Sequence, residues 1–285
     1  MDNNQYFQIK QLTLNIYKSF VRQMNVITKQ ANLADEYNRI SLEQKMNFEE
    51  FCLQFLLCLI SFFKSNMGFI EEFDFIQGSA QPSEFLLTYI NEIELGLTYI
   101  CQINQVPNEE IFRACAEFWN WFCFKVCFLK EKNIDPETIS FCLLKDASIN
   151  DYIAFTSQLF LYQYLYFKIL EKVRQILISK MTKPVEVKIS VDETGEIVVE
   201  AITNTTFQTL YETLKECLIY LTHLDPVFTN NYMLESLQMQ TAEQNWNPIL
   251  LNSVCWSIGS IAGAMEESHE KKFLVMVIKV RRCII

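Results

Sequence analysis

Residues 251–279, LNSVCWSIGSIAGAMEESHEKKFLVMVIK, carry the strongest structural signal in the chain. Apolar residues recur every three or four positions on both sides of the acidic segment, and this spacing predicts two amphipathic helices joined by a tight turn. Gly259 and Gly263 lie four residues apart on the first predicted helix. Small residues at this spacing would let a neighbouring helix backbone approach closely, so we expect this stretch to pack against other helices.

Helical periodicity continues along most of the chain. Only six glycines and six prolines stand against 23 phenylalanines and 12 tyrosines, a balance that favours long helices with short connections. The polar stretches 30–42 and 130–150 are expected to be loops between helices. Helices are expected near residues 4–29, 44–66, 82–103, 107–131, 150–181, 205–223, 229–240, 247–265 and 268–282.

Consecutive antiparallel helix pairs of this length, without a strict sequence repeat, are typical of an α-solenoid of the HEAT kind. Each pair can bury its apolar face only against its neighbours, so stability is shared along the stack. The sequence therefore predicts an all-α fold in which residues 1–285 form one α-solenoid segment of about four HEAT repeats, with one β-hairpin inserted between helices.

Residues 184–201 break the helical pattern. Apolar and polar residues alternate over 185–191, turn residues follow at 192–195, and residues 196–201 run back with Gly195 suited to a positive φ. This pattern predicts a β-hairpin. A two-stranded hairpin alone is marginally stable in water, so we expect it to lie on the concave side of the solenoid. The predicted polar face carries Glu186, Asp192, Glu196 and Glu200.

Composition excludes several classes of function. The formal net charge is −10 and the isoelectric point is near 4.9, which disfavours a nucleic-acid binder and suits basic protein partners. The start, MDNNQYFQIKQ, has no secretory signal pattern. The apolar runs at 51–63 and 159–170 are shorter than the roughly 18 residues that a membrane span needs, so they predict buried helices and no membrane insertion.

The ten cysteines are expected to be reduced thiols. Several lie within apolar helical patterns, where a free cysteine packs as a small hydrophobe: Cys52, Cys58, Cys115, Cys123 and Cys127. Cys123 and Cys127, four residues apart, could hold a metal, but zinc needs about four ligands and neither histidine is near in sequence. Core packing is the favoured interpretation, and no metal or cofactor is expected.

Catalytic interpretations are weak. Cys217, His223 and Asp225 could suggest a catalytic trio, but positions 217 and 223 lie on different faces of a helix. No phosphate-binding glycine loop and no metalloprotease or hydrolase motif is present, so an enzyme is not expected. An aromatic stretch is too broad for one helix face and predicts packing between two helices rather than a ligand cage: Trp119, Trp121, Phe122, Phe124 and Phe128.

The order of residues in 251–279 resembles the LN-x-x-CW-x-IGSI-x-GAM…EK-[KR]-FLV-x-VIK segment of the exportin-1 family, nuclear export receptors of the importin-β superfamily. Upstream, EEIFRACAEFWN at 109–120 is similar to the family's E-x-E-I-F-K-x-C-L-E-Y-W-N. The segment 181–225 is similar to the family's acidic-loop segment and can be matched without a gap. The resemblance is strong over 97–279 and weaker before that.

The resemblance implies a HEAT-repeat receptor that shuttles between nucleus and cytoplasm and is not an enzyme. Its implied partners are Ran-GTP, leucine-rich export-signal cargo in the full-length receptor, and nuclear pore proteins. In that family an acidic loop crosses the inside of a ring of repeats and contacts Ran. The implied loop acids of this chain are Glu186, Asp192, Glu193, Glu196 and Glu200.

The chain also departs from the family pattern. Val185, Val191, Asn204 and Thr206 stand where the family tends to carry acids, and residues 280–285 depart from its continuation. We therefore expect residues 280–285 to be a truncation or a tail foreign to the family. We expect the chain as a whole to be a middle slice of the receptor that binds no export signal by itself. The alternatives are a generic HEAT scaffold without Ran dependence and a truncated product without independent activity.

Overall fold

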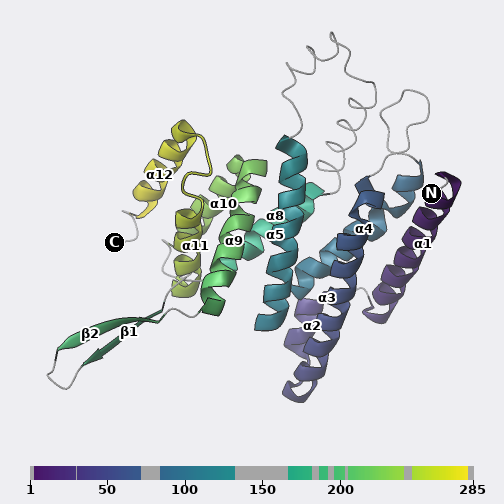
Figure 1. The fold of residues 1–285 in the computed structure, drawn as a ribbon. Coiled ribbons are helices and arrows are strands. Elements are labelled where there is room, and N and C mark those ends of the chain that lie inside the picture. Colours follow the sequence, from purple (N-terminus) through teal and green to yellow (C-terminus); the bar gives the residue numbers. More distant parts are fainter. Residues whose placement is uncertain are drawn as a thin grey trace, which may run out of the picture. The chain divides into compact units, whose positions relative to one another are not determined.

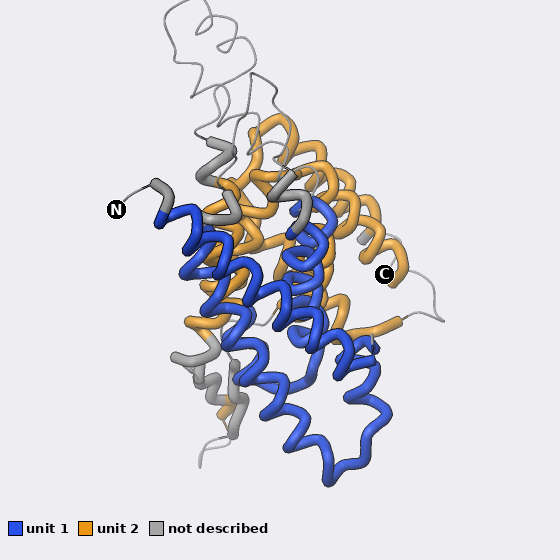
Figure 2. The backbone as a smooth tube through the Cα atoms, turned by 90° about the vertical axis from the view of Figure 1, so that its right-hand side faces the viewer, with its two compact units in different colours: residues 1–115, 128–170 blue, residues 116–127, 171–285 orange. Residues whose placement is uncertain are grey.

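The computed structural model describes residues 3–29, 31–71, 84–131, 166–181, 186–191, 196–202, 205–240 and 246–281 (Figure 1). These residues form helices and one pair of strands. The chain divides into two compact units, drawn in two colours in Figure 2. Unit 1 contains residues 1–115 and 128–170, and unit 2 contains residues 116–127 and 171–285.

Unit 1 is built from long helices packed in pairs. Tyr17 of α1 stacks on Phe62 of α3 with ring centroids 3.8 Å apart, and Phe20 meets Phe55 at 5.8 Å, so α1 and α3 run antiparallel. The predicted helix pairs are therefore present in unit 1. The helices are α1 (Asn3–Ile27), α2 (Leu33–Arg39), α3 (Leu42–Glu71), α4 (Glu84–Ile103) and both ends of α5 (Glu109–Glu131).

Helices α1 and α4 run parallel and in step. The Tyr89 hydroxyl donates to the Asn15 Oδ1 at 2.7 Å, and the Tyr99 hydroxyl donates to the Asn25 Oδ1 at 3.0 Å. Both bonds join residues 74 positions apart. Between them, Gly96 allows the Tyr17 ring to approach α4 closely, because a Cβ at position 96 would collide with the Tyr17 hydroxyl.

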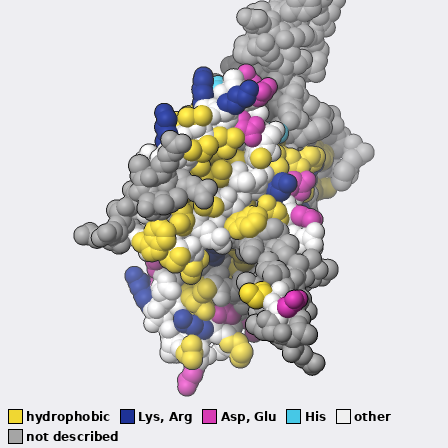
Figure 3. Space-filling view, turned by 90° about the vertical axis from the view of Figure 1, so that its left-hand side faces the viewer, with side chains coloured by type: hydrophobic (Ala, Val, Ile, Leu, Met, Phe, Trp, Pro, Cys, Tyr) yellow, Lys and Arg dark blue, Asp and Glu magenta, His cyan; other side chains and the backbone are white. Residues whose placement is uncertain are grey.

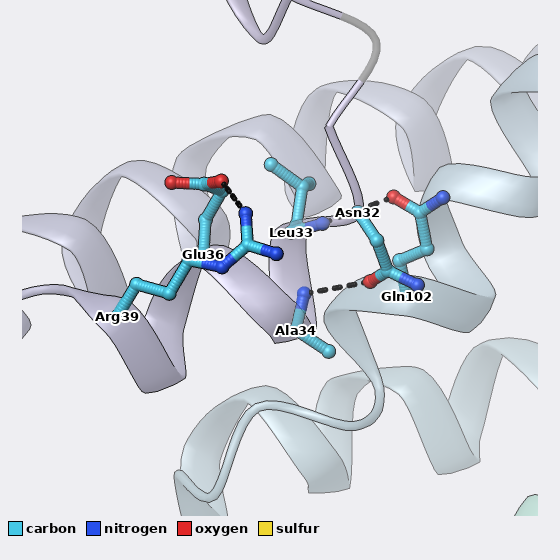
Figure 4. Close-up of polar contacts among 6 residues, drawn as sticks. All are labelled: Asn32, Leu33, Ala34, Glu36, Arg39 and Gln102. Carbon is cyan, nitrogen blue, oxygen red and sulfur yellow. Dashed lines mark hydrogen bonds and ion pairs between the residues drawn. The ribbon is translucent and has the colours of Figure 1, made fainter.

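The polar segment before α3 is not a loop throughout, which corrects the prediction. It contains α2, whose Leu33 and Tyr37 are buried. The Asn32 side chain accepts from the Ala34 N–H at 2.9 Å and starts the helix, while the Gln102 side chain accepts from the Leu33 N–H at 3.3 Å (Figure 4). This short helix was missed because its N-cap and two apolar anchors fall within an otherwise polar sequence.

Helix α3 extends well beyond the apolar run seen in the sequence. Over Leu42–Met67 it is long and apolar enough to cross a membrane, by length and composition alone. The same helix supplies unit 1 with buried side chains such as Phe55, Leu59 and Phe63. Cys58 is exposed on α3, so the expectation that it packs in the core is wrong, whereas Cys52 is fully buried.

Unit 2 also contains parallel helices in step. The Asn120 amide of α5 donates to the Glu216 carboxylate of α9 at 2.8 Å, and the Phe124 and Tyr220 rings lie 5.6 Å apart. Both contacts join residues 96 positions apart. The unit contains the middle of α5, most of α8 (Phe167–Lys180), α9 (Thr205–Leu224), α10 (Pro226–Met239), α11 (Pro248–Ser260) and α12 (Glu267–Arg281).

Asparagine and aspartate caps set where α10 and α11 begin. The Asp225 side chain accepts from the Phe228 N–H at 2.9 Å, and the Asn247 side chain accepts from the N–H groups of Ile249 and Leu250. Each cap is followed by a proline at the first helical position, where its missing N–H costs nothing. Helix α10 therefore begins three residues earlier than the predicted 229.

The stretch 251–279 forms two helices and a turn, but the glycines do not act as predicted. Helix α11 ends at Ser260, and Gly263 lies in the turn with a φ of 78°, a conformation that favours glycine. The Glu270 carboxylate accepts from the Gly263 N–H at 2.9 Å and closes the turn. No atom lies within 4 Å of a Cβ built on Gly259 or Gly263, so neither glycine supports a close helix approach.

The alternating segment forms two antiparallel strands, β1 (Glu186–Val191) and β2 (Ile197–Ile202). Their register pairs Ile189 with Val199 and Val191 with Ile197. The turn that would make them a hairpin falls on residues 192–195, which lie outside the described residues, as does the first half of the predicted helix at 150–181, residues 150–165.

Candidate partner-binding surface

The strand pair holds the acids that the sequence singles out. Glu186 begins β1 opposite Ile202, and Glu200 lies in β2 directly opposite Lys188. Glu196 immediately precedes β2 and is exposed. Asp192 and Glu193 lie between the strands, outside the described residues. The register thus brings Glu186 and Glu200 to nearby positions of one small sheet, with Glu196 at its end.

The strand register separates polar from apolar positions. Alternate residues of a strand belong to opposite faces of its sheet, so the pairs Val187–Ala201, Ile189–Val199 and Val191–Ile197 share one face. Ile197 on that face is 72% exposed. The opposite face takes its charge from Glu186, Lys188 and Glu200.

Lys188 is the site residue that sequence reasoning passed over. Its position across from Glu200 is given by the strand register. The paired positions are symmetric about position 194, so counting outward from Gly195 would not have given this pairing. Segment 186–202 holds five acids and one lysine, so its formal charge is −4. The segment is acidic as a whole, and its lysine occupies the register position opposite Glu200.

Unit 2 does not bring the suspected catalytic residues together. Cys217 is fully buried, whereas His223 is exposed and Asp225 uses its carboxylate to cap α10. Burial, followed by a hydrogen bond with the Cys123 side chain, raises the pKa of the Cys217 thiol well above its usual value. A neutral buried thiol is a poor nucleophile. Among the residues that the structure describes, no group of three or more His, Cys, Asp or Glu side chains could hold a metal.

The aromatic stretch of α5 packs as the sequence predicts where it is described. Trp119 and Phe122 are fully buried and meet edge to face at 5.8 Å. Phe124 is 44% exposed and contacts Tyr220 on α9. The stretch therefore joins α5 to a neighbouring helix. The side chain of Phe128 lies outside the described residues.

Two helices expose apolar stripes. On α1, Leu12, Ile16 and Val26 are each more than 60% exposed, on the side opposite the buried Leu14 and Val21. Helix α12 buries Phe273 but exposes a row of apolar side chains. Figure 3 looks at the side on which α12 is drawn, where hydrophobic side chains gather among charged ones. The exposed apolar side chains of α12 are Leu274, Val275 and Ile278 on one side and Met276 on another.

Comparison with known protein families finds three matches along the chain. Residues 92–126 match the "Chromosome region maintenance or exportin repeat", residues 162–229 match "CRM1 / Exportin repeat 2", and residues 242–280 match "CRM1 / Exportin repeat 3". The three matches follow one another in chain order.

Individual proteins with similar sequences include exportin-1 of Schizosaccharomyces pombe, 32% identical over 268 residues, which are 91% of this chain and 23% of that protein. Protein EXPORTIN 1A of Arabidopsis thaliana is 30% identical over 272 residues, 93% of this chain and 23% of the relative. Exportin-1 of Dictyostelium discoideum is 35% identical over 226 residues, 78% of this chain and 18% of the relative. The chain thus spans less than a quarter of the length of these relatives.

Proposed function

The chain is a homologue of one region of exportin-1, and from this premise we propose that it is a binding segment of a nuclear export receptor. The observation that carries the proposal is the succession of three exportin repeats from residue 92 to residue 280. A receptor of this kind works by binding its partners, so the proposed activity is transport and not catalysis, and it needs no cofactor. Its location alternates between nucleus and cytoplasm as it passes the nuclear pore proteins.

We propose that the helices form one α-solenoid segment of the HEAT kind. The parallel, in-step pairs α1/α4 in unit 1 and α5/α9 in unit 2 support this arrangement, because corresponding helices of successive repeats run parallel when helix pairs are stacked. The strand pair interrupts this series between α8 and α9.

The acids of the strand pair are the proposed contact with Ran-GTP. The charge of −4 over 186–202 would attract a basic protein surface, speed the encounter and favour one orientation. Exposed ion pairs contribute about 0.2–1 kcal/mol each, so no single acid decides the affinity. The proposed contact residues are Glu186, Asp192, Glu193, Glu196 and Glu200.

Export-signal cargo is proposed to bind only to a full-length receptor. We expect this chain by itself to bind no leucine-rich export-signal peptide. Fluorescence anisotropy of a labelled signal peptide titrated with the chain checks this expectation. Saturable binding at micromolar concentrations, competed by unlabelled signal peptide, would contradict it.

The proposal can be tested in a receptor that contains this chain. The chain replaces the matched region of the S. pombe exportin-1, and the hybrid is compared with a version lacking residues 185–201. The hybrid should bind Ran-GTP more tightly than Ran-GDP and bind cargo more tightly when Ran-GTP is present. The deletion should weaken this coupling while circular dichroism shows unchanged helix content. Unchanged coupling after the deletion would contradict the proposal that residues 185–201 link Ran-GTP binding to cargo binding.

A generic helical scaffold without Ran dependence is the second candidate. It is favoured by the placement of Lys188 opposite Glu200, which weakens the acidic character of the sheet, and by Val185 and Val191 at positions where the exportin-1 pattern tends to carry acids. Equal binding of the hybrid to Ran-GTP and Ran-GDP would support this second candidate.

A further inference from the structure

Two thiols meet in the interior of unit 2, between α5 and α9. Cys123 of α5 and Cys217 of α9 are each 0% exposed, and their side chains form a hydrogen bond with each other. Both cysteines are reduced in the structure. Their contact joins two helices that are distant in the sequence, and neither residue belongs to the strand pair proposed to contact Ran-GTP. The pair is therefore a candidate for a role outside partner binding.

The helix geometry brings the two thiols together independently of their hydrogen bond. The Asn120–Glu216 hydrogen bond and, one turn further, the Phe124–Tyr220 ring contact show that α5 and α9 run parallel and in step. The α5 thiol lies in the turn between Asn120 and Phe124, and the α9 thiol lies in the turn between Glu216 and Tyr220. Both thiols therefore occupy the same turn of the interface. Because both are fully buried, they also lie on its inner side.

We infer that Cys123 and Cys217 are a latent redox cross-link, which a peroxide converts into a disulfide between α5 and α9. One thiolate attacks an oxygen of hydrogen peroxide, the O–O bond breaks, and the sulfur becomes a sulfenic acid, while the departing hydroxide takes up the thiol proton and leaves as water. The second thiol attacks this sulfenic sulfur, loses its proton, and displaces the hydroxyl group as a second water. Two thiols and one peroxide thus yield one disulfide and two waters.

Burial controls how fast this oxidation proceeds. It raises the pKa of the Cys217 thiol well above its usual value, and the nearby positive charge of Arg174 offsets only part of this effect. The thiolate is the form that reacts, so oxidation should be slow at neutral pH and faster at higher pH. Exposed cysteines such as Cys58 and Cys255 should react first. The cross-link therefore responds to sustained oxidation rather than to a brief pulse.

The disulfide would fasten two helices that lie on either side of the strand pair in the sequence. It closes a loop that contains α8, β1 and β2. A cross-link across a long loop stabilises a protein mainly by restricting its unfolded chain. Oxidation should therefore raise the thermal unfolding midpoint by several degrees, and a reductant such as dithiothreitol should reverse the rise.

Peptide mapping of the whole chain tests the inference. The chain is treated with hydrogen peroxide at pH 7 and at pH 8.5, blocked by alkylation, and digested with trypsin and chymotrypsin without reductant. Mass spectrometry should find a linked Cys123–Cys217 peptide that forms more slowly than Cys255 is oxidised and accumulates faster at pH 8.5. Cleavage after Lys125 separates Cys123 from Cys127, so a link between these neighbours would be recognised. That link, or recovery of Cys123 and Cys217 unlinked after prolonged treatment, overturns the proposal.

Substitutions test the effect of the cross-link on stability. Cys217→Ala should abolish both the linked peptide and the rise of the unfolding midpoint on oxidation. The matched control Cys255→Ala removes an exposed cysteine of α11 and should keep both. An equal rise in Cys217→Ala and in the unaltered chain would show that another oxidation causes it, and would contradict the cross-link. Neither experiment involves Ran, so the outcome is independent of the proposed export function.

Discussion

The α1/α4 contact and the α5/α9 contact have the same geometry but different chemistry. Each joins two parallel helices in step, the first within unit 1 and the second within unit 2. Between α1 and α4, tyrosine hydroxyls bond to asparagine side chains at 2.7 and 3.0 Å. Between α5 and α9, one hydrogen bond from Asn120 to Glu216 is joined by the ring contact of Phe124 with Tyr220 and by the buried Cys123 and Cys217 side chains.

The difference shows that helix stacking in this chain does not require one kind of interface. Hydrogen bonds at matched intervals set the register of α1 against α4, because Asn15 and Asn25 are ten residues apart and so are Tyr89 and Tyr99. A ladder of directional bonds resists sliding by one turn. In contrast, α5 and α9 combine one such bond with an aromatic contact and two buried thiols, so close packing contributes beside the polar bond.

The largest expected effect is on the buried aromatic side chains of α5 in unit 2. Trp119→Ala should lower the free energy of unfolding by about 3–5 kcal/mol, because it removes a fully buried ring and leaves a cavity. Chemical denaturation followed by circular dichroism measures this loss. The neighbouring Trp121 is only partly buried, so Trp121→Ala should cost clearly less. Equal losses for the two variants would contradict the packing described for α5.

Gly96→Ala should lower the free energy of unfolding by about 1–3 kcal/mol, because it disturbs the contact between α1 and α4. The added methyl collides with the Tyr17 hydroxyl, and Tyr17 cannot turn away easily because its ring is stacked on Phe62. Thermal and chemical denaturation of the whole chain check this. The control is Gly259→Ala, where no atom lies within 4 Å and alanine favours the helix, so stability should stay the same or rise slightly. Destabilisation by both substitutions alike would refute the close α1/α4 approach.

Alkaline pH should weaken the α5/α9 interface through Cys217. Burial raises the pKa of this thiol above the ordinary value of 9.0. Above pH 9 the unfolded chain therefore loses a proton that the folded chain retains, and stability falls by up to about 1.4 kcal/mol per pH unit for one thiol. Denaturation at intervals from pH 8 to pH 10.5 measures the slope.

Cysteine substitutions identify the source of that slope. Cys217→Ala should make it shallower, whereas Cys255→Ala should not, because Cys255 is exposed. Burial also raises the pKa of the Cys52 thiol in unit 1, to about 12, so this thiol contributes a similar loss of stability at alkaline pH. Replacing Cys52 together with Cys217 should therefore make the slope shallower still. An unchanged slope in Cys217→Ala would mean that this thiol is not buried in the folded chain.

The smallest effect concerns single hydroxyls. Tyr89→Phe should cost about 0.5–1.5 kcal/mol, because the Asn15 side chain loses its part-buried donor. Tyr220→Phe removes an exposed bond to Glu216 and should cost less than 0.5 kcal/mol. Denaturation midpoints of the two variants, measured side by side, separate these values. A reversed order would contradict the part-buried Tyr89–Asn15 bond between α4 and α1.

Periodicity alone predicted most helices, because apolar residues that recur at helical spacing over many residues mark the buried side of a helix. It did not find α2, whose seven residues depend on the Asn32 cap and on the Gln102 side chain from a distant part of the chain. It also placed Gly263 on a helix, since the spacing of Gly259 and Gly263 carries no information about φ. The bond from the Gly263 N–H to Glu270 fixes that turn and requires the folded geometry.

The candidate site was only partly predictable. Alternation located both strands, and the acids could be named individually. The pairing of Lys188 with Glu200 required the register, which depends on the length of the return between strands. The assignment of the acids to Ran rests on resemblance to exportin-1, and local sequence physics adds only the sign of the charge.

The most direct test of the central claim measures Ran-GTP association with the hybrid receptor that carries this chain. Five substitutions neutralise the strand-pair acids without changing their size: Glu186→Gln, Asp192→Asn, Glu193→Gln, Glu196→Gln and Glu200→Gln. Stopped-flow measurements over a range of salt concentrations should give slower association and a weaker salt dependence for the neutralised receptor. Identical association rates and identical salt dependence would contradict the claim that this acidic strand pair faces Ran.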